Sequence, residues 1–294
     1  MTGEEIFAAL EATTYWEQPY QVHITGGEPF LKFSLLLHAV EAASELGIQV
    51  YAETNGGWCV SDDLVERRFS ALRYAGMSAL LISCSPFHAE TIPPERTIMA
   101  IRKSLEIFGP QYTMVYLPGW LEQIQAFGSD TPTPLEAYVQ VYGQEDAGRM
   151  FWQGYSLISG GRAGYRLGHL TPKQSPDSFR EQSCQQELLY AQHSHFDLYG
   201  NFIPAFCGGL VVGDWHQLPH LIEDFQANNY SPLLKTLIEA GPYGLYEMAQ
   251  ETYGYSALEN GYAGKCHLCV DVRRNLVEKG DFVELQPVEF YENF

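Results

Sequence analysis

Hydrophobic and polar positions follow two alternating patterns through the first half of the chain. Short apolar runs rich in β-branched residues, typical of buried strands, alternate with segments in which apolar residues recur every three or four positions, typical of amphipathic helices. The pattern predicts strands at about 21–25, 48–53, 78–83, 111–117 and 154–159, and helices at about 31–46, 62–75, 95–108 and 135–147. Strands that alternate with helices of this length indicate βαβ units and a parallel sheet, so the predicted fold class is α/β.

Local signals fix several of these helix ends. Thr2 and Glu5 have the spacing of a capping box, which predicts a further helix that begins almost at the first residue. Ser61 or Asp62 is expected to begin the helix at about 62–75, and Gly76 to end it.

The pattern changes after about residue 168. Residues 171–187 are polar and contain two prolines, which is typical of a linker, so a domain boundary is predicted near 170–183. Beyond it, glycine turns and short apolar runs replace the strand–helix alternation. The segment Phe196–Pro204 predicts two short strands around a Tyr-Gly-Asn turn.

Composition and charge exclude several partners. The chain has 294 residues, 46% of them hydrophobic, and its net charge of −19 comes from 17 basic and 36 acidic residues. This balance argues against nucleic acid and against an anionic membrane surface, which both require clustered Lys and Arg. No apolar run approaches the roughly 20 residues of a membrane-spanning helix, and the acidic N-terminus lacks the features of a signal peptide. We therefore expect a cytoplasmic protein.

Three predicted strands end in residues suited to ligand binding. Gly26-Gly27-Glu28-Pro29 follows the first strand, Glu53-Thr54-Asn55-Gly56 the second, and Ser83 ends the third. The carboxyl ends of parallel strands meet at one edge of a sheet, where α/β proteins bind their ligands. Glycines and proline also make ordinary tight turns, which is the alternative interpretation of these strings.

Six cysteines without an export signal indicate metal or redox chemistry in a reducing compartment. Cys59 and Cys84 are expected to be small buried residues. The remaining four form a candidate metal site in the second half: Cys184, Cys207, Cys266 and Cys269. The last two have the Cys-x2-Cys spacing that places two sulfurs on one turn. Four thiolates suit either zinc or an iron–sulfur cluster, and spacing alone slightly favours zinc.

Taken together, these motifs resemble those of radical S-adenosylmethionine (SAM) enzymes. Gly26-Gly27-Glu28-Pro29 is similar to the family's GGEP motif, in which backbone and glutamate bind the SAM amine. The resemblance implies that Glu53 and Asn55 line the SAM ribose side, that the Ser83 hydroxyl bonds SAM, and that Arg162, in a Gly-Arg-Ala string, approaches the SAM carboxylate.

The second half resembles a shortened SPASM (twitch-type) domain, which implies an auxiliary 4Fe–4S cluster in place of zinc at the four cysteines. The implied fold is an incomplete, TIM-like (β/α)6 partial barrel over residues 1–172, followed by a small cysteine-rich cluster domain over 173–294.

The resemblance also implies an activity. Family members use a first, SAM-ligated 4Fe–4S cluster and an electron donor to release a 5′-deoxyadenosyl radical, which modifies a peptide or a small molecule. The Cys-x3-Cys-x2-Cys loop that holds this first cluster is not in the sequence. Three interpretations follow: an N-terminal segment is missing, a separate polypeptide supplies the loop, or the chain is a degenerate relative that binds a cluster, a partner or SAM without catalysis.

Overall fold

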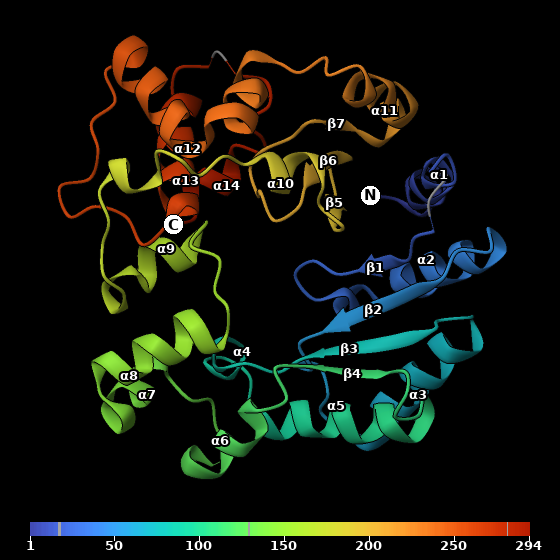
Figure 1. Cartoon of the computed structure of the whole chain (residues 1–294). Coiled ribbons are helices and arrows are strands. Elements are labelled where there is room, and N and C mark those ends of the chain that lie inside the picture. Colours follow the sequence, from blue (N-terminus) through green and yellow to red (C-terminus); the bar gives the residue numbers. More distant parts are fainter. Residues whose placement is uncertain (17–18, 129, 281) are drawn as a thin grey trace. The chain divides into compact units, whose positions relative to one another are not determined.

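The computed structural model describes residues 1–16, 19–128, 130–280 and 282–294 (Figure 1). The chain divides into two compact units, Met1–Val141 and Tyr142–Phe294. This division falls earlier than the boundary predicted near 170–183 from composition. The assignment of 1–172 and 173–294 to two functional domains stays a prediction.

The first unit contains a sheet of four parallel strands in the order β1-β2-β3-β4, which establishes the α/β class. Its strands are β1 (Val22–Ile24), β2 (Val50–Thr54), β3 (Ala79–Ser83) and β4 (Thr113–Tyr116). Its helices are α1 (Gly3–Thr13), the 3₁₀ helix η1 (Pro29–Lys32), α2 (Phe33–Glu45), α3 (Asp62–Tyr74), α4 (Pro86–Ala89), α5 (Pro94–Ile107), α6 (Trp120–Phe127) and α7 (Leu135–Tyr142).

The predicted helix starts are confirmed by their caps. The Thr2 hydroxyl accepts a hydrogen bond from the Glu5 amide at 3.2 Å, and the Glu5 carboxylate accepts one from the Thr2 amide. At the start of α3, the Ser61 hydroxyl accepts from the Leu64 amide. These side chains satisfy amides that have no partner inside the helix.

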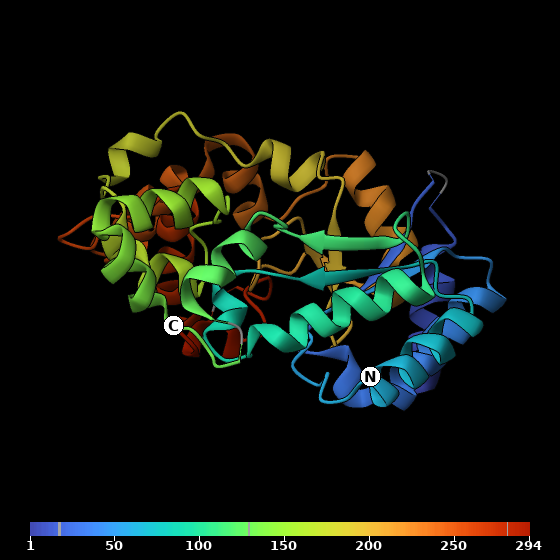
Figure 2. The same ribbon diagram turned by 90° about the horizontal axis from the view of Figure 1, so that it is seen from below.

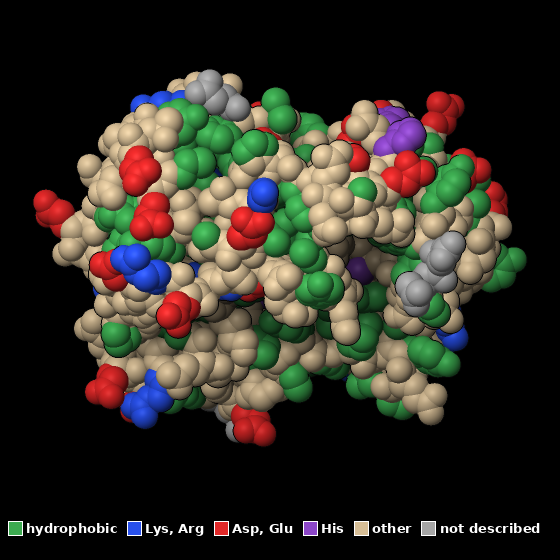
Figure 3. All heavy atoms as spheres, turned by 45° about the horizontal axis from the view of Figure 1, so that its top comes forward, with side chains coloured by type: hydrophobic (Ala, Val, Ile, Leu, Met, Phe, Trp, Pro, Cys, Tyr) green, Lys and Arg blue, Asp and Glu red, His purple; other side chains and the backbone are tan. Residues whose placement is uncertain are grey.

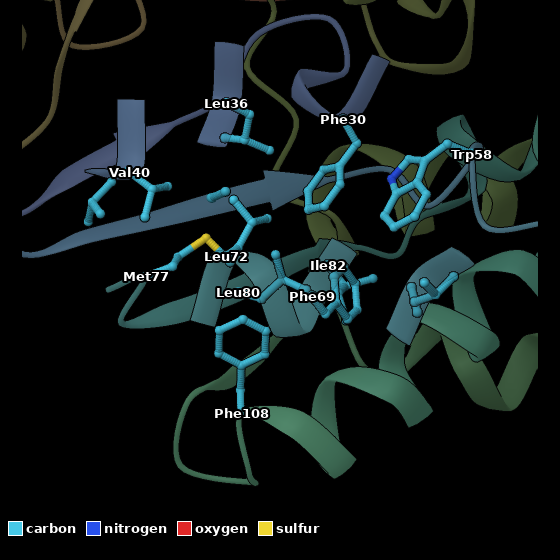
Figure 4. Close-up of a cluster of buried hydrophobic side chains, with 14 of the residues drawn as sticks. Phe30, Leu36, Val40, Trp58, Phe69, Leu72, Met77, Leu80, Ile82 and Phe108 are labelled. Atoms are coloured by element: carbon cyan, nitrogen blue, oxygen red, sulfur yellow. The ribbon is translucent and has the colours of Figure 1, made fainter. Parts of the chain in front are cut away.

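One face of the parallel sheet lies on the hydrophobic core of the first unit. Figures 1 and 2 show α3 and α5 on this face of the sheet. Along β2, burial alternates: Val50, Ala52 and Thr54 are buried, whereas Tyr51 and Glu53 are only partly covered. Figure 4 shows apolar side chains from helices and strands that meet in this core: Phe30, Leu36, Val40, Trp58, Phe69, Leu72, Met77, Leu80, Ile82 and Phe108. The core side of each strand is thus fixed, and the polar residues are left on the other face.

The second unit is mainly helical and has its own core. Its helices are α8 (Gln144–Arg149), the π-helical turn η2 (Met150–Gly154), α9 (Arg162–Arg166), the 3₁₀ turns η3 (Gly168–Leu170), η4 (Pro176–Phe179) and η5 (Trp215–Gln217), α10 (Gln185–Leu189), α11 (Leu218–Gln226), α12 (Pro232–Tyr253), α13 (Lys265–Val277) and α14 (Glu289–Glu292). A small antiparallel sheet contains β5 (Ser194–Phe196), β6 (Asn201–Pro204) and β7 (Gly213–Asp214). The strands β5 and β6 confirm the hairpin predicted for Phe196–Pro204.

Two predicted elements are wrong. Residues 154–159 form no strand: the chain leaves η2, Ser156 has a positive φ of 49°, and the Ser159 hydroxyl accepts a hydrogen bond from the His267 amide near the start of α13. The predicted helix at 135–147 is interrupted at Gly143, whose φ of 81° separates α7 from α8. The described residues therefore contain four parallel strands rather than five, and the (β/α)6 partial barrel is not confirmed.

The acidic excess of the sequence is spread over the surface. In the face shown in Figure 3, Asp and Glu side chains are scattered, with fewer Lys and Arg among them. Within the described ranges, no helix combines the length and the apolar character needed to cross a membrane.

Candidate functional site

The turn after β1 presents bare backbone at the carboxyl edge of the sheet. Gly26 and Gly27 are exposed, and a Cβ atom added at either position would meet no heavy atom within 4 Å. Gly26 has a φ of 129°, which side chains other than glycine's rarely allow. The two glycines therefore leave their amides and carbonyls open to a ligand. Pro29 begins η1 directly after them.

Glu28 fastens this turn to the end of β2. Its Oε1 accepts hydrogen bonds from the Phe30 amide at 3.1 Å and the Thr54 hydroxyl at 3.0 Å, and its Oε2 accepts from the Asn55 amide at 2.8 Å. Burial raises the pKa of the Glu28 carboxyl, and these hydrogen bonds offset only part of that effect. A carboxylate offers about four acceptor positions, so one remains for a ligand.

Glu53 lies at the centre of a polar network on the face of the sheet away from the core. Its Oε1 accepts a hydrogen bond from the Ser83 hydroxyl at 2.5 Å, and its Oε2 accepts from the Thr25 hydroxyl at 3.2 Å. His23 Nε2 lies 3.3 Å from the same Oε2. Burial acts to raise the pKa of Glu53, but the hydrogen bonds from His23 and Ser83 outweigh it, and the pKa is lowered. Glu53 is therefore ionised at neutral pH.

Sequence reasoning missed His23 of this network, whereas His88 was expected to be a hydrogen-bonding loop residue. The His23 ring stacks on Tyr51, with centroids 4.4 Å apart and an interplanar angle of 10°, because the two residues pair in the register of β1 and β2. His88 Nδ1 lies 2.7 Å from the Ser85 hydroxyl. Burial lowers the pKa of His88, while the charge of Glu53 opposes this shift. The two-residue periodicity of β1 and β2 was the available signal for His23.

The remaining predicted SAM residues fall in two places. Asn55 directly follows β2, and its Oδ1 accepts a hydrogen bond from the Gly57 amide at 2.8 Å. Ser83 is buried at the end of β3 and donates to Glu53. Both belong to the same sheet edge as Glu28. Arg162 lies in the second unit, exposed at the start of α9, and its expected role toward the SAM carboxylate stays a prediction.

The four cysteines of the second half come together from three segments of the second unit. Cys184 precedes α10 and donates its amide hydrogen to the Leu237 carbonyl of α12, Cys207 follows the β5–β6 hairpin, and Cys266 and Cys269 lie on the first turns of α13. The thiols of Cys184, Cys207 and Cys266 each lie near enough to Cys269 for its charge to disfavour their ionisation. None of the four forms a disulfide.

Burial is the main electrostatic feature of this cysteine group. It raises the pKa of Cys266 to about 11 and of Cys207 to about 12, and it also raises that of Cys184. Two cations oppose these shifts: Lys265, which pairs with Glu187 at 2.5 Å, and Arg273, which acts on Cys207 and Cys266. The thiols of Cys184, Cys207 and Cys266 are therefore protonated at neutral pH unless a bound metal replaces the protons.

The donor set of the cysteine group fits a tetrathiolate centre, but the thiols are not placed around a single metal ion. Among residues 1–16, 19–128, 130–280 and 282–294, no group of three or more His, Cys, Asp or Glu side chains has an arrangement that could hold a metal ion. A bound zinc ion would thus have to draw the thiols together, whereas a 4Fe–4S core is larger and its four thiolates lie farther apart. The Gly160-Gly161-Arg162 turn lies beside this group, since a Cβ added at Gly160 would be 3.7 Å from the Cys266 Cβ.

Cys59 and Cys84 belong to a different environment. Both are fully buried in the first unit, and burial raises the pKa of each thiol to about 12. They match the expectation of small buried residues, and they serve below as comparison thiols.

Comparison with known proteins identifies no family for this chain. No protein-family model matches the chain, and no curated protein matches it.

Proposed function

We propose that this chain is a radical SAM-type protein that binds SAM at the strand ends of its first unit and one auxiliary 4Fe–4S cluster at the cysteine group of its second unit. The observation that carries the proposal is the convergence of four free thiols from three segments on one partly buried region. Four thiolates are the ligand set of a 4Fe–4S cluster. Zinc accepts the same set and is the alternative occupant; the GGEP resemblance favours the cluster.

The strand-end network supports the SAM half of the proposal. SAM carries positive charge on its sulfonium and its ammonium group. Glu53 is an ionised carboxylate on the open face of the sheet, and Glu28 keeps one acceptor position beside the exposed backbone of Gly26 and Gly27. Carboxylates and free carbonyls are the groups that recognise an ammonium ion and ribose hydroxyls.

The proposed activity depends on a further group. A SAM-ligated 4Fe–4S cluster, when bound, supplies the electron that cleaves SAM to a 5′-deoxyadenosyl radical, which abstracts hydrogen from a peptide or small-molecule substrate. We propose that its Cys-x3-Cys-x2-Cys loop comes from a segment before Met1 or from a partner polypeptide, and that a separate electron donor and a cytoplasmic, reducing location complete the system. Without such a loop, the same two sites would make this a non-catalytic binding or partner protein.

Anaerobic reconstitution tests the cluster. The protein is incubated with ferrous iron and sulfide, desalted, and analysed for iron and visible absorption. We expect about four irons per chain and broad visible absorption. Cys266→Ala should lose both, whereas Cys59→Ala, which removes a buried thiol from the first unit, should retain them. Bound zinc without visible absorption would show that zinc, and not a 4Fe–4S cluster, occupies the four cysteines. A wild-type protein that binds neither zinc nor iron would overturn the proposal.

Equilibrium dialysis with labelled SAM tests the other half. The wild-type chain should bind SAM, and Glu53→Gln should weaken binding by about 10- to 150-fold, since a hydrogen bond to a charged group contributes about 1.5–3 kcal/mol. Glu45→Gln, which neutralises an exposed carboxylate at the end of α2, is the matched control and should leave binding unchanged. Equal SAM affinity of wild type and Glu53→Gln would show that Glu53 does not take part in SAM binding. A wild-type protein that does not bind SAM would overturn the SAM half of the proposal.

A further inference from the structure

A buried arginine stands beside the cysteine group. Arg273 lies on α13, four residues after Cys269 and seven after Cys266, so the three side chains share one face of the helix. Only 2% of Arg273 is exposed. A guanidinium is always protonated in proteins, so this position carries a permanent positive charge inside the second unit.

The neighbours of Arg273 do not neutralise that charge. Its Nη1 donates hydrogen bonds to the Gly208 carbonyl at 3.0 Å and the Tyr291 hydroxyl at 3.2 Å. Its Nε is buried and has no hydrogen-bond partner in the described part of the chain. No Asp or Glu carboxylate among the described residues lies within 4.0 Å of its nitrogens. The Cys269 side chain lies within electrostatic reach of the guanidinium.

Burial of a cation without an anionic partner costs folding free energy. Hydrogen bonds to a carbonyl and a hydroxyl offset part of this cost but do not neutralise the charge. The charged groups that act on Arg273 most strongly include the thiolate forms of Cys269 and Cys207. When four cysteines bind zinc or an oxidised 4Fe–4S core, their four negative charges exceed the two positive charges of the metal centre. The filled centre is thus an anion, and it would lie next to Arg273, which has no carboxylate partner within 4.0 Å among the described residues. Lys265, in contrast, is already paired with Glu187.

We propose that Arg273 is the buried counter-charge of the metal–thiolate centre held by Cys184, Cys207, Cys266 and Cys269. The inference rests on the proposed function, because it requires that these cysteines bind a metal or cluster. Arg273 is a positioning residue rather than a ligand, since a guanidinium has no lone pair to donate. It stabilises the filled centre and destabilises the empty one.

Three variants separate this role from simple packing. Arg273→Met removes the charge and keeps an unbranched side chain, Arg273→Lys keeps a charge, and Arg274→Met removes an exposed arginine from the next position of α13. Zinc is the equilibrium probe of the four thiolates, and its affinity is measured by competition with a chromophoric chelator at fixed pH. We expect Arg273→Met to weaken zinc binding by about 10- to 100-fold, the range typical of groups outside the ligand shell. Arg273→Lys should keep most of the affinity, and Arg274→Met all of it.

Thermal unfolding of the metal-free variants gives a readout that a merely structural role would not produce. If Arg273 is an uncompensated charge in the empty protein, Arg273→Met should unfold at the same temperature as wild type or higher. A lower melting temperature of metal-free Arg273→Met, or zinc affinity equal to that of wild type, would overturn the inference while leaving the metal site intact. A wild-type protein that takes up neither zinc nor iron would overturn the proposed function and, with it, this inference.

Discussion

The turn that carries the GGEP string should depend on Glu28 for its stability, and Glu28→Gln tests this. The carboxylate accepts hydrogen bonds from Phe30, Thr54 and Asn55 at 3.1, 3.0 and 2.8 Å. A glutamine can keep its carbonyl oxygen at the Oε1 position, where two donors meet. Its amide nitrogen then faces the Asn55 amide, so that two donors point at each other.

The magnitude follows from this geometry. One hydrogen bond to a charged acceptor is lost, at about 1.5–3 kcal/mol, and a donor is left unsatisfied. Burial raises the pKa of Glu28, so removal of its charge returns part of this free energy. We therefore expect Glu28→Gln to lower the free energy of unfolding of the first unit by about 2 kcal/mol, which corresponds to about 30-fold in the equilibrium constant.

Two assays locate the effect. Urea unfolding followed by circular dichroism gives the free energy, and native-state hydrogen exchange shows whether protection is lost at the Asn55 amide. Trp58 is a local reporter, since its Nε1 donates to Thr54 at 2.9 Å and its ring stacks on Phe30. The control Glu45→Gln should change stability by no more than about 0.5 kcal/mol. A change equally small in Glu28→Gln, with Asn55 exchange unaltered, would refute the argument.

Two further predictions concern pH and backbone geometry. Because the pKa of Glu53 is lowered in the folded protein, its contribution to stability is present above the ordinary carboxyl value of 4.5 and is lost as the pH falls below it. In urea unfolding, the free energy of unfolding of wild type should exceed that of Glu53→Gln at neutral pH, and the difference should disappear in acid. A difference that does not depend on pH would contradict the prediction. Gly241, inside α12, has φ 66° and ψ −160°, and a Cβ there would lie 2.0 Å from the Gln182 carbonyl oxygen. Gly254, the C-cap of α12, has the left-handed values φ 69° and ψ 28°, and a Cβ there would meet nothing within 4 Å. Gly241→Ala should therefore cost about 3 kcal/mol or more and Gly254→Ala about 1 kcal/mol in thermal unfolding, and equal losses would contradict the prediction.

The sequence predicted much of the first unit because local and long-range signals agree there. In β2, the alternation of Val50, Tyr51, Ala52 and Glu53 matches the burial of the strand in the structure. The error at 154–159 has the opposite cause. The pattern at 154–159 predicts a short strand, but the segment is a loop in which the Ser159 hydroxyl accepts a hydrogen bond from the His267 amide of α13. No periodicity in the sequence indicates such a tertiary contact.

In the candidate sites too, contacts that depend on tertiary packing could not be predicted from the sequence. That Glu53 and Ser83 would meet at one sheet edge followed from the positions of both at strand ends. His23 needed the register of β1 on β2, which sets its contact with Glu53. Arg273 lies on a helix beside Arg274, and the two are equivalent in sequence. Only the packed second unit distinguishes them, since one is buried next to thiols and the other is exposed.

The central claim is that four cysteines from separate segments form one cluster site, and iron and sulfide analysis of Cys184→Ala tests it most directly. Cys184 lies far in sequence from Cys266 and Cys269, so its effect depends on their convergence in the fold. The account predicts about four irons and four sulfides per chain in reconstituted wild type, and their loss in Cys184→Ala as complete as in Cys266→Ala. Full iron and sulfide retained by Cys184→Ala would contradict it.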